Sequence, residues 1–332
     1  MVKAAKSPAS RVSVRLSLPV PHRPTVGLAL GSGSARGWAH IGVIQSLREA
    51  GVQIDYVAGA SMGAVVGAAF CAGQLDVLVE EARLLDWRRL ASMLDLTLPR
   101  SGLLVGKKIA AFIRHLVRDC ALEELPIPFW AVATNLRTGQ EIWLRQGSTA
   151  EAVRASLSLP GIFIPVRWGS SWLVDGGLAN PVPVSVCRAM GADIIIAVNL
   201  NADILLRSRK NSAGQDQGKP PQRDQRLRPA LQQYWQHRGE QFRKLLPLPR
   251  RAGETPLSIF EVLLYSLNVM QDRITKHRLA ADPPDFLITP SLRHIQLLEF
   301  HRADEAIAEG ARATQTLLPA LCERVEQESR TE

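Results

Sequence analysis

The chain has 332 residues, of which 46% are apolar, and a formal net charge of +9. This length suits one large α/β domain or two smaller ones, and the uncharged apolar runs fall well short of the roughly 20 residues of a membrane-spanning helix. The four cysteines lie far apart without CxxC spacing, so we expect no metal site, no disulfide framework and no cofactor; they are Cys71, Cys120, Cys187 and Cys322.

Most of the positive charge lies in two segments. Residues 1–23 contain five basic and no acidic side chains, and residues 206–251 contain twelve basic and three acidic ones, which leaves 23 basic and 28 acidic side chains elsewhere. The N-terminal segment has arginines and prolines where a secretory signal needs a continuous apolar core. We expect residues 1–23 to be disordered and the protein to be cytoplasmic.

The first predicted element is an apolar strand, TVGLALG, at residues 25–31. Apolar residues near helical spacing follow in SARGWAHIGVIQSLREAG, residues 34–51, and predict a helix that stops at its final glycine. A second strand, IDYVAG at residues 54–59, and a second helix, MGAVVGAAFCAG at residues 62–73, come next. This alternation is typical of a parallel sheet with crossover helices.

Between the second strand and the second helix lies GASMG, which fits the G-x-S-x-G pattern of a nucleophile elbow. A serine on a sharp strand-to-helix turn needs small neighbours two residues away, and Gly59 and Gly63 are small. The helix that begins at Met62 directs its positive end toward the place where an oxyanion develops. The segment predicts Ser61 to be a catalytic nucleophile, although any tight turn can carry such a string.

The loop GSGSARG, from Gly31 to Gly37, joins the first strand to the first helix. Its small residues let backbone N–H groups approach an anionic oxygen closely, so it is a candidate oxyanion hole. The alternative is a dinucleotide-binding fingerprint. Against that interpretation, the glycine spacing is G-x-G-x-x-x-G, and Asp55 lies at the start of the second strand, whereas a ribose-binding acid lies at its end.

Later apolar runs predict further strands of the same sheet: FWAVATNL (129–136), EIWLRQG (141–147), RWGSSWLVDGG (167–177) and ADIIIAVNL (192–200). Asp175 follows one of these strands and precedes Gly176 and Gly177. The string is either a plain Asp-Gly-Gly turn or the position of the base that a nucleophilic serine needs.

The chain after residue 205 begins with a segment rich in Gln, Arg and Pro, residues 206–251, which predicts a disordered insertion. It is either a linker without a partner or a polybasic segment attracted to anionic membranes. A nucleic-acid role is weaker, since no binding motif accompanies the charge. Residues 257–279 and 295–325 read as helices around a last strand at 282–290, so residues 252–332 are predicted to complete the domain formed by residues 24–205.

Taken together, the glycine-rich loop, GASMG and the Asp-Gly-Gly string resemble the patatin-like phospholipase family. The resemblance runs from about Thr25 to Asn199, includes RASLSLPGIFIPV before the aspartate strand, and returns in LLEFHRADEAIAEGARAT near the C-terminus. It implies an α/β fold of three layers, with a mostly parallel sheet between helices. It also implies a serine acyl hydrolase that acts on lipid or acyl-ester substrates without a metal.

Carried over to this sequence, the resemblance implies that Ser61 is the nucleophile and Asp175 the base of a serine–aspartate dyad. The residues implied to form the oxyanion hole are Ser32, Gly33, Ser34 and Arg36. The family loop commonly has consecutive glycines, whereas two serines interrupt it here, and serine tolerates positive φ poorly. A catalytically weak scaffold that binds acyl lipids or a regulatory partner is therefore the alternative.

Histidines offer the other alternative, a Ser-His-Asp esterase. The chain order of Ser61, Asp175 and then His277, His294 or His301 fits an α/β-hydrolase. None of the three histidines lies between a strand and a loop, and His301 reads as a helix residue. His40, beside the glycine-rich loop, is expected to serve packing or a hydrogen bond more than an accessory role in the site.

Overall fold

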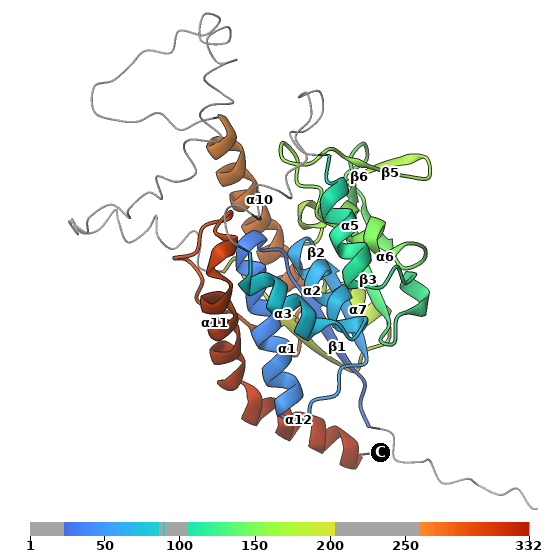
Figure 1. Ribbon diagram of the computed structural model, residues 1–332. Helices are drawn as coiled ribbons and strands as arrows, with labels where there is room; N and C mark the ends of the chain where they lie inside the picture. The colour runs from blue at the N-terminus through green and yellow to red at the C-terminus, as the bar shows by residue number, and fades with distance from the viewer. Residues whose placement is uncertain (1–22, 86–88, 90–104, 203–258, 332) are drawn as a thin grey trace, which may run out of the picture.

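The fold is organised around one eight-stranded sheet between two layers of helices (Figure 1). The computed structural model describes residues 23–85, 89, 105–202 and 259–331. Residues 1–22 and the insertion at 206–251, with its predicted disorder and membrane attraction, lie outside the described residues. The predicted α/β fold, with a mostly parallel sheet flanked by helices, is confirmed.

Five of the strands are parallel and the other three extend the sheet beyond β3 in antiparallel pairings. The order is β5-β6-β3-β2-β1-β7-β8, with β4 also paired to β3. The central strands β1 and β7 are buried at every residue, which explains their continuous apolar sequences. The strands are β1 (Val26–Leu30), β2 (Tyr56–Ala60), β3 (Phe129–Asn135), β4 (Glu141–Leu144), β5 (Val166–Trp168), β6 (Ser171–Asp175), β7 (Ile194–Val198) and β8 (Phe286–Ile288).

Two strands, β2 and β6, meet end to end along one edge of β3. Residues 131 and 132 of β3 pair with both β2 and β4, so those two strands lie on opposite edges. Residues 133 and 134 pair with both β4 and β6, so β6 shares its edge with β2. Ala60, the last residue of β2, and Asp175, the last residue of β6, therefore occupy successive places on that edge. The chain has to leave the sheet at Ser61, directly beside Asp175.

Most helices cover one face of the sheet and pack on the larger apolar core. They are η1 (Ser34–Trp38), α1 (Ala39–Glu49), α2 (Met62–Cys71), α3 (Leu75–Arg83), α5 (Lys107–Leu116), η2 (Leu122–Glu124), α6 (Thr149–Ser156), η4 (Phe300–Arg302), α11 (Ala303–Gln315) and α12 (Leu318–Thr331). The smaller core on the other face is covered by α7 (Val184–Ala189) and the end of α10 (Ile259–Ala281), while η3 (Gly176–Leu178) follows β6. Among the described residues, no helix is long and apolar enough to cross a bilayer.

Two of the predicted helical segments differ in detail from the helices of the structure. The segment from residue 34 starts as a 3-10 turn, η1, before α1 begins at Ala39. The apolar periodicity over residues 295–325 predicts one helical stretch, whereas the structure has η4, α11 and α12. Pro319 lies in the first turn of α12, where its missing N–H has no intrahelical acceptor to lose, so the proline begins a new helix instead of continuing α11.

Helix α11 runs alongside α1 (Figure 1), and a glycine on each helix lies at the contact. A Cβ on Gly42 would lie 1.9 Å from the carbonyl oxygen of Ile307, and a Cβ on Gly310 would lie 2.0 Å from that of Ala39. Backbone occupies both positions, so neither neighbour can rotate away. Only glycine at both places lets the two helices approach this closely.

Gly310→Ala should therefore lower the free energy of unfolding by about 1–3 kcal/mol, because the helices must separate to admit the methyl group. Urea denaturation followed by circular dichroism measures the change. Ala308→Gln, at an exposed position of the same helix, is the control and should change stability by less than about 0.5 kcal/mol. Equal stability of Gly310→Ala and wild type would contradict this account of the helix contact.

Candidate active site

Ser61 lies on the turn between β2 and α2 in a strained backbone conformation, with φ +55° and ψ −122°. Its N–H donates to Ser156 Oγ at 2.9 Å, which helps to hold this conformation. The flanking glycines leave no room for a side chain, since a Cβ on Gly63 would lie 2.2 Å from Leu30 O, and one on Gly59 would lie 2.6 Å from the carbonyl oxygen of Gly63. The small residues on both sides of Ser61 are thus required by the turn itself.

The Ser61 hydroxyl donates a hydrogen bond to Asp175 Oδ2 at 2.6 Å. The other carboxylate oxygen, Oδ1, accepts the N–H of Gly177 at 2.7 Å. Asp175 has no exposed surface and Ser61 is 8% exposed. No cation forms an ion pair with this carboxylate among the described residues. A hydroxyl and a buried carboxylate, 114 residues apart in the chain, are thereby in direct contact.

Burial raises the pKa of Asp175 to about 6, against the opposing effect of its hydrogen bonds from Ser61 and Gly177. The carboxyl group is therefore ionised at neutral pH, where it can accept the Ser61 proton. It is also a stronger base than an exposed aspartate, because its environment disfavours the charged form.

The backbone of Asp175 is fixed from two elements that the sequence analysis did not connect with the site. Thr134 Oγ1, on β3, donates to the carbonyl oxygen of Asp175 at 2.8 Å. The N–H of Asp175 donates to the carbonyl oxygen of Ser158 at 2.9 Å. Ser156 and Ser158 belong to RASLSLPGIFIPV, so the only signal in the sequence was the resemblance of that segment.

The glycine-rich loop offers two unengaged amides beside Ser61. The N–H groups of Gly31 and Ser32 donate to Val198 O and Pro181 O, at 3.1 and 2.8 Å. Those of Gly33 and Ser34 have no protein acceptor among the described residues, and both residues line the recess at Ser61.

The two serines of the loop differ in conformation. Ser34 has a φ of +48°, a backbone conformation that is strained for serine and that glycine adopts readily. Ser32 does not have a positive φ. The backbone amide of Arg36 donates to the carbonyl oxygen of Gly33 at 3.1 Å. The guanidinium side chain of Arg36 is buried, and this burial lowers its pKa to about 10. Arg36 does not line the recess. The amides of Ser32 and Arg36 are thus engaged within the protein, which leaves those of Gly33 and Ser34 without an acceptor among the described residues.

The recess at Ser61 is closed. The cavity that remains there is about 10 Å³, which is room for about one water molecule. Helix α10 supplies four of the ten residues that line the recess. The sequence analysis did not assign this helix to the site. The lining residues are Ser32, Gly33, Ser34, Ser61, Leu159, Leu264, Leu267, Asn268, Gln271 and Leu297.

His40 forms a hydrogen bond with Gly31, the first residue of the glycine-rich loop. Its Nε2 lies 2.7 Å from the carbonyl oxygen of Gly31, and its Nδ1 is buried without a partner in the described part of the chain. Burial lowers the pKa of His40 to about 4, so the ring is neutral at pH 7. Because a carbonyl oxygen only accepts, Nε2 carries the proton. His40 thus makes its hydrogen bond to the glycine-rich loop and not within a helix.

The three other candidate histidines lie away from the recess, whose lining contains no histidine among the described residues. His294 Nε2 is 2.7 Å from Glu305 Oε1, His301 lies in the 3-10 turn η4, and His277 is exposed on α10. The hydrogen-bond partner of the Ser61 hydroxyl is a carboxylate and not an imidazole.

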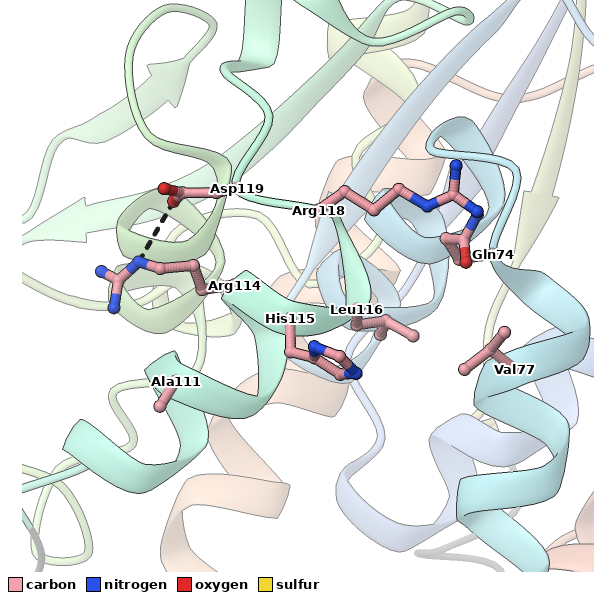
Figure 2. Close-up of a pocket in the computed structure, with 8 residues that line it drawn as sticks. All are labelled: Gln74, Val77, Ala111, Arg114, His115, Leu116, Arg118 and Asp119. Atoms are coloured by element: carbon pink, nitrogen blue, oxygen red, sulfur yellow. Dashed lines mark ion pairs between the residues drawn. The ribbon is translucent and has the colours of Figure 1, made fainter.

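A second hollow, of about 550 Å³, lies between α3 and α5 (Figure 2). Val77, Ala111 and Leu116 provide its apolar lining, and Figure 2 shows the Arg114 side chain directed to Asp119, with which it forms an ion pair at 3.2 Å. It shares no lining residue with the recess at Ser61. We therefore place the candidate chemistry at Ser61.

Comparisons with known proteins agree on one family. Residues 28–188 match the family model described as patatin-like phospholipase. An uncharacterized NTE family protein of Mycobacterium bovis is 38% identical over 329 residues, covering 89% of this chain and 91% of that protein. The mouse patatin-like phospholipase domain-containing protein 6 is 34% identical over 185 residues, which cover 54% of this chain and 14% of the mouse protein.

Solved structures with a similar course of the chain include human GIVD cytosolic phospholipase A2 in complex with methyl gamma-linolenyl fluorophosphonate. That pair has a TM-score of 0.44 at 12% identity, over 96% of this chain and 61% of the human one. VipD from Legionella pneumophila has a TM-score of 0.40 at 14% identity, over 90% of this chain and 67% of VipD.

The raised pKa of Asp175 predicts a stability difference that depends on pH. Between pH 3.8 and about 6 the folded protein keeps a proton that the unfolded chain releases, so wild-type stability falls as the pH rises through this window. Asp175→Asn lacks this loss. Its stability relative to wild type should therefore increase by about 3 kcal/mol from pH 3.5 to pH 7. Urea denaturation at several pH values measures the difference, and a constant difference would rule out a raised pKa.

His40→Phe should lower stability by about 1–3 kcal/mol at pH 7, because the carbonyl of Gly31 loses its ring donor inside the protein. The cost should shrink from pH 6.5 toward pH 4, because in this window the unfolded wild type takes up a proton that the buried imidazole does not. Denaturation of both proteins at each pH gives the comparison. His40→Gln, whose amide can donate, should recover part of the loss; no recovery would mean that shape and not the hydrogen bond matters.

Proposed function

This chain belongs to the patatin-like phospholipase family, and from that premise we propose that it is a serine acyl hydrolase that cleaves fatty-acyl esters of lipids with a Ser61–Asp175 dyad. Membership of the family supports a lipid hydrolase. The observation that carries the finer proposal is the 2.6 Å hydrogen bond from the Ser61 hydroxyl to a buried carboxylate at a strained strand-to-helix turn.

In the first step of the proposed reaction, Ser61 Oγ attacks the ester carbonyl carbon while Asp175 Oδ2 takes the hydroxyl proton. The tetrahedral intermediate collapses, the alcohol leaves with the proton from Asp175, and an acyl-serine ester remains. Asp175 then takes a proton from water, the resulting hydroxide attacks the acyl-serine, and the proton returns to Ser61 as the fatty acid is released. Each proton taken by Asp175 is returned, so the enzyme is regenerated.

The proposed oxyanion hole uses the amides of Gly33 and Ser34, which have no other acceptor among the described residues. The N-terminus of α2, which begins at Met62 directly after the nucleophile, adds its positive end. Donors that are fixed before the reaction stabilise a developing negative charge without reorganisation. The hydrogen bond from His40 to Gly31 helps to keep this loop in place.

Asp175 is suited to act as the base because of its burial. A pKa of about 6 lies close enough to neutral pH that the carboxylate is ionised and its conjugate acid is still a useful proton donor to the leaving alcohol. The same burial brings the Ser61 proton and the carboxylate together without competing water.

A second candidate function is a scaffold that binds acyl lipids and turns them over slowly or not at all. The small volume of the recess favours it, since no acyl chain fits into about 10 Å³. In that case Ser61 would not react with an electrophile that mimics an acyl ester.

Labelling with a fluorophosphonate, read by intact mass, tests the dyad. Wild type should be labelled once, and Ser61→Ala and Asp175→Asn should lose labelling and hydrolysis of a p-nitrophenyl acyl ester by about a thousandfold or more. His277→Ala, His294→Ala and His301→Ala are the controls and should retain both. Loss of labelling in any folded histidine variant would sink the dyad, and a folded wild type that stays unlabelled both with and without lipid vesicles would favour the scaffold.

A further inference from the structure

Helix α10 closes the recess above Ser61. Leu264, Leu267, Asn268 and Gln271 point into it from one face of the helix and are each at most 9% exposed. The space that remains is about 10 Å³, so no acyl chain fits while α10 stays in this position. Whatever brings a lipid to Ser61 must act on this helix.

The outward face of α10 is apolar. Val262, Tyr265, Val269 and Met270 are 49%, 59%, 44% and 50% exposed. Val262, Tyr265 and Val269 are spaced by three and four residues, which places them on one side of the helix, and Met270 follows Val269 at the border of that side. A helix on a protein surface normally carries polar residues there. Four of the ten large exposed apolar side chains in the described part of the chain are on this one helix, and Figure 1 shows its first turns rising beyond α1 and α11.

Positive charge follows directly along the same helix. Arg273 is exposed and has no ion-pair partner among the described residues, and Lys276 is exposed although it pairs with Asp272 at 2.6 Å. An apolar face bordered by cationic side chains fits the boundary between acyl chains and anionic headgroups.

We propose that the outward face of α10, formed by Val262, Tyr265, Val269 and Met270, docks on an anionic lipid surface, and that docking displaces α10 and opens the recess at Ser61. The inference rests on the proposed function for the lipid nature of the substrate. Burying the outer face in the lipid offsets the contacts that the inner face loses when the helix moves.

Sedimentation with vesicles of phosphatidylcholine and phosphatidylglycerol tests the docking surface. Val269→Glu should bind these vesicles about tenfold more weakly than wild type, and Val269→Ser should show a smaller loss. Val77→Glu is the matched control, because Val77 is also 44% exposed but lies on α3, in the layer on the opposite face of the sheet. Wild-type binding by Val269→Glu, or an equal loss in Val77→Glu, would overturn the proposal.

Sedimentation velocity without lipid tests whether a second copy of this chain, instead of a lipid surface, covers the outward face of α10. A wild-type dimer that Val269→Glu dissociates, with vesicle binding unchanged, would assign the face to a second copy of this chain. Ser61→Ala should bind vesicles as wild type does, so docking is tested whether or not the protein hydrolyses lipids.

The rate of fluorophosphonate labelling at Ser61 tests the opening. Vesicles should raise the wild-type rate at least fivefold and leave that of Val269→Glu unchanged, while the two proteins label equally without vesicles. An unchanged wild-type rate on vesicles would overturn the displacement of α10. A wild type that is never labelled would instead contradict the proposed function, and the sedimentation result would stand by itself.

Discussion

The candidate site depends on two strands that end against each other on one edge of β3. The last place of β2 is occupied by Ala60 and the next place on that edge by Asp175, the last residue of β6. A continuing β2 would collide with β6, so the chain turns out of the sheet at Ser61 and directs its hydroxyl to the neighbouring carboxylate. The contact between the two side chains is thus a consequence of how the sheet is paired.

The surroundings of this contact restrict motion on every side. The N–H of Ser61 is bound by Ser156, and the backbone of Asp175 by Thr134 and Ser158. His40 fixes the carbonyl of Gly31 at the start of the loop. A carboxylate without a cation partner is costly inside a protein, and these hydrogen bonds keep it where the hydroxyl can share its charge. A site held this firmly needs little reorganisation when charge moves between its atoms.

The sequence allowed the fold class and the succession of strands and helices along the chain to be predicted, and it singled out Ser61 and Asp175, because each depends on local patterns. Apolar runs identify buried strands, and small residues identify the sharp turn at GASMG. Other features depend on contacts between distant segments. The roles of Ser156 and Thr134, the partner of His40 and the coverage by α10 could not be read from spacing, and neither could the engaged amide of Ser32, whose acceptor is Pro181. The sequence analysis did not divide residues 295–325 into three helical pieces, although Pro319 indicates the start of a new helix.

The crossing of α1 and α11 brings the last part of the chain back onto the first. Ala35 donates its N–H to Leu297 O at 3.0 Å, and α10, β8 and α11 all come from residues beyond 258. During synthesis, residues 23–202 leave the ribosome before these elements, so the strands that carry Ser61 and Asp175 are made before the helix that covers them. The cover over Ser61 is therefore added after the residues that it shields, which makes the closing of the recess a late step in the assembly of the fold.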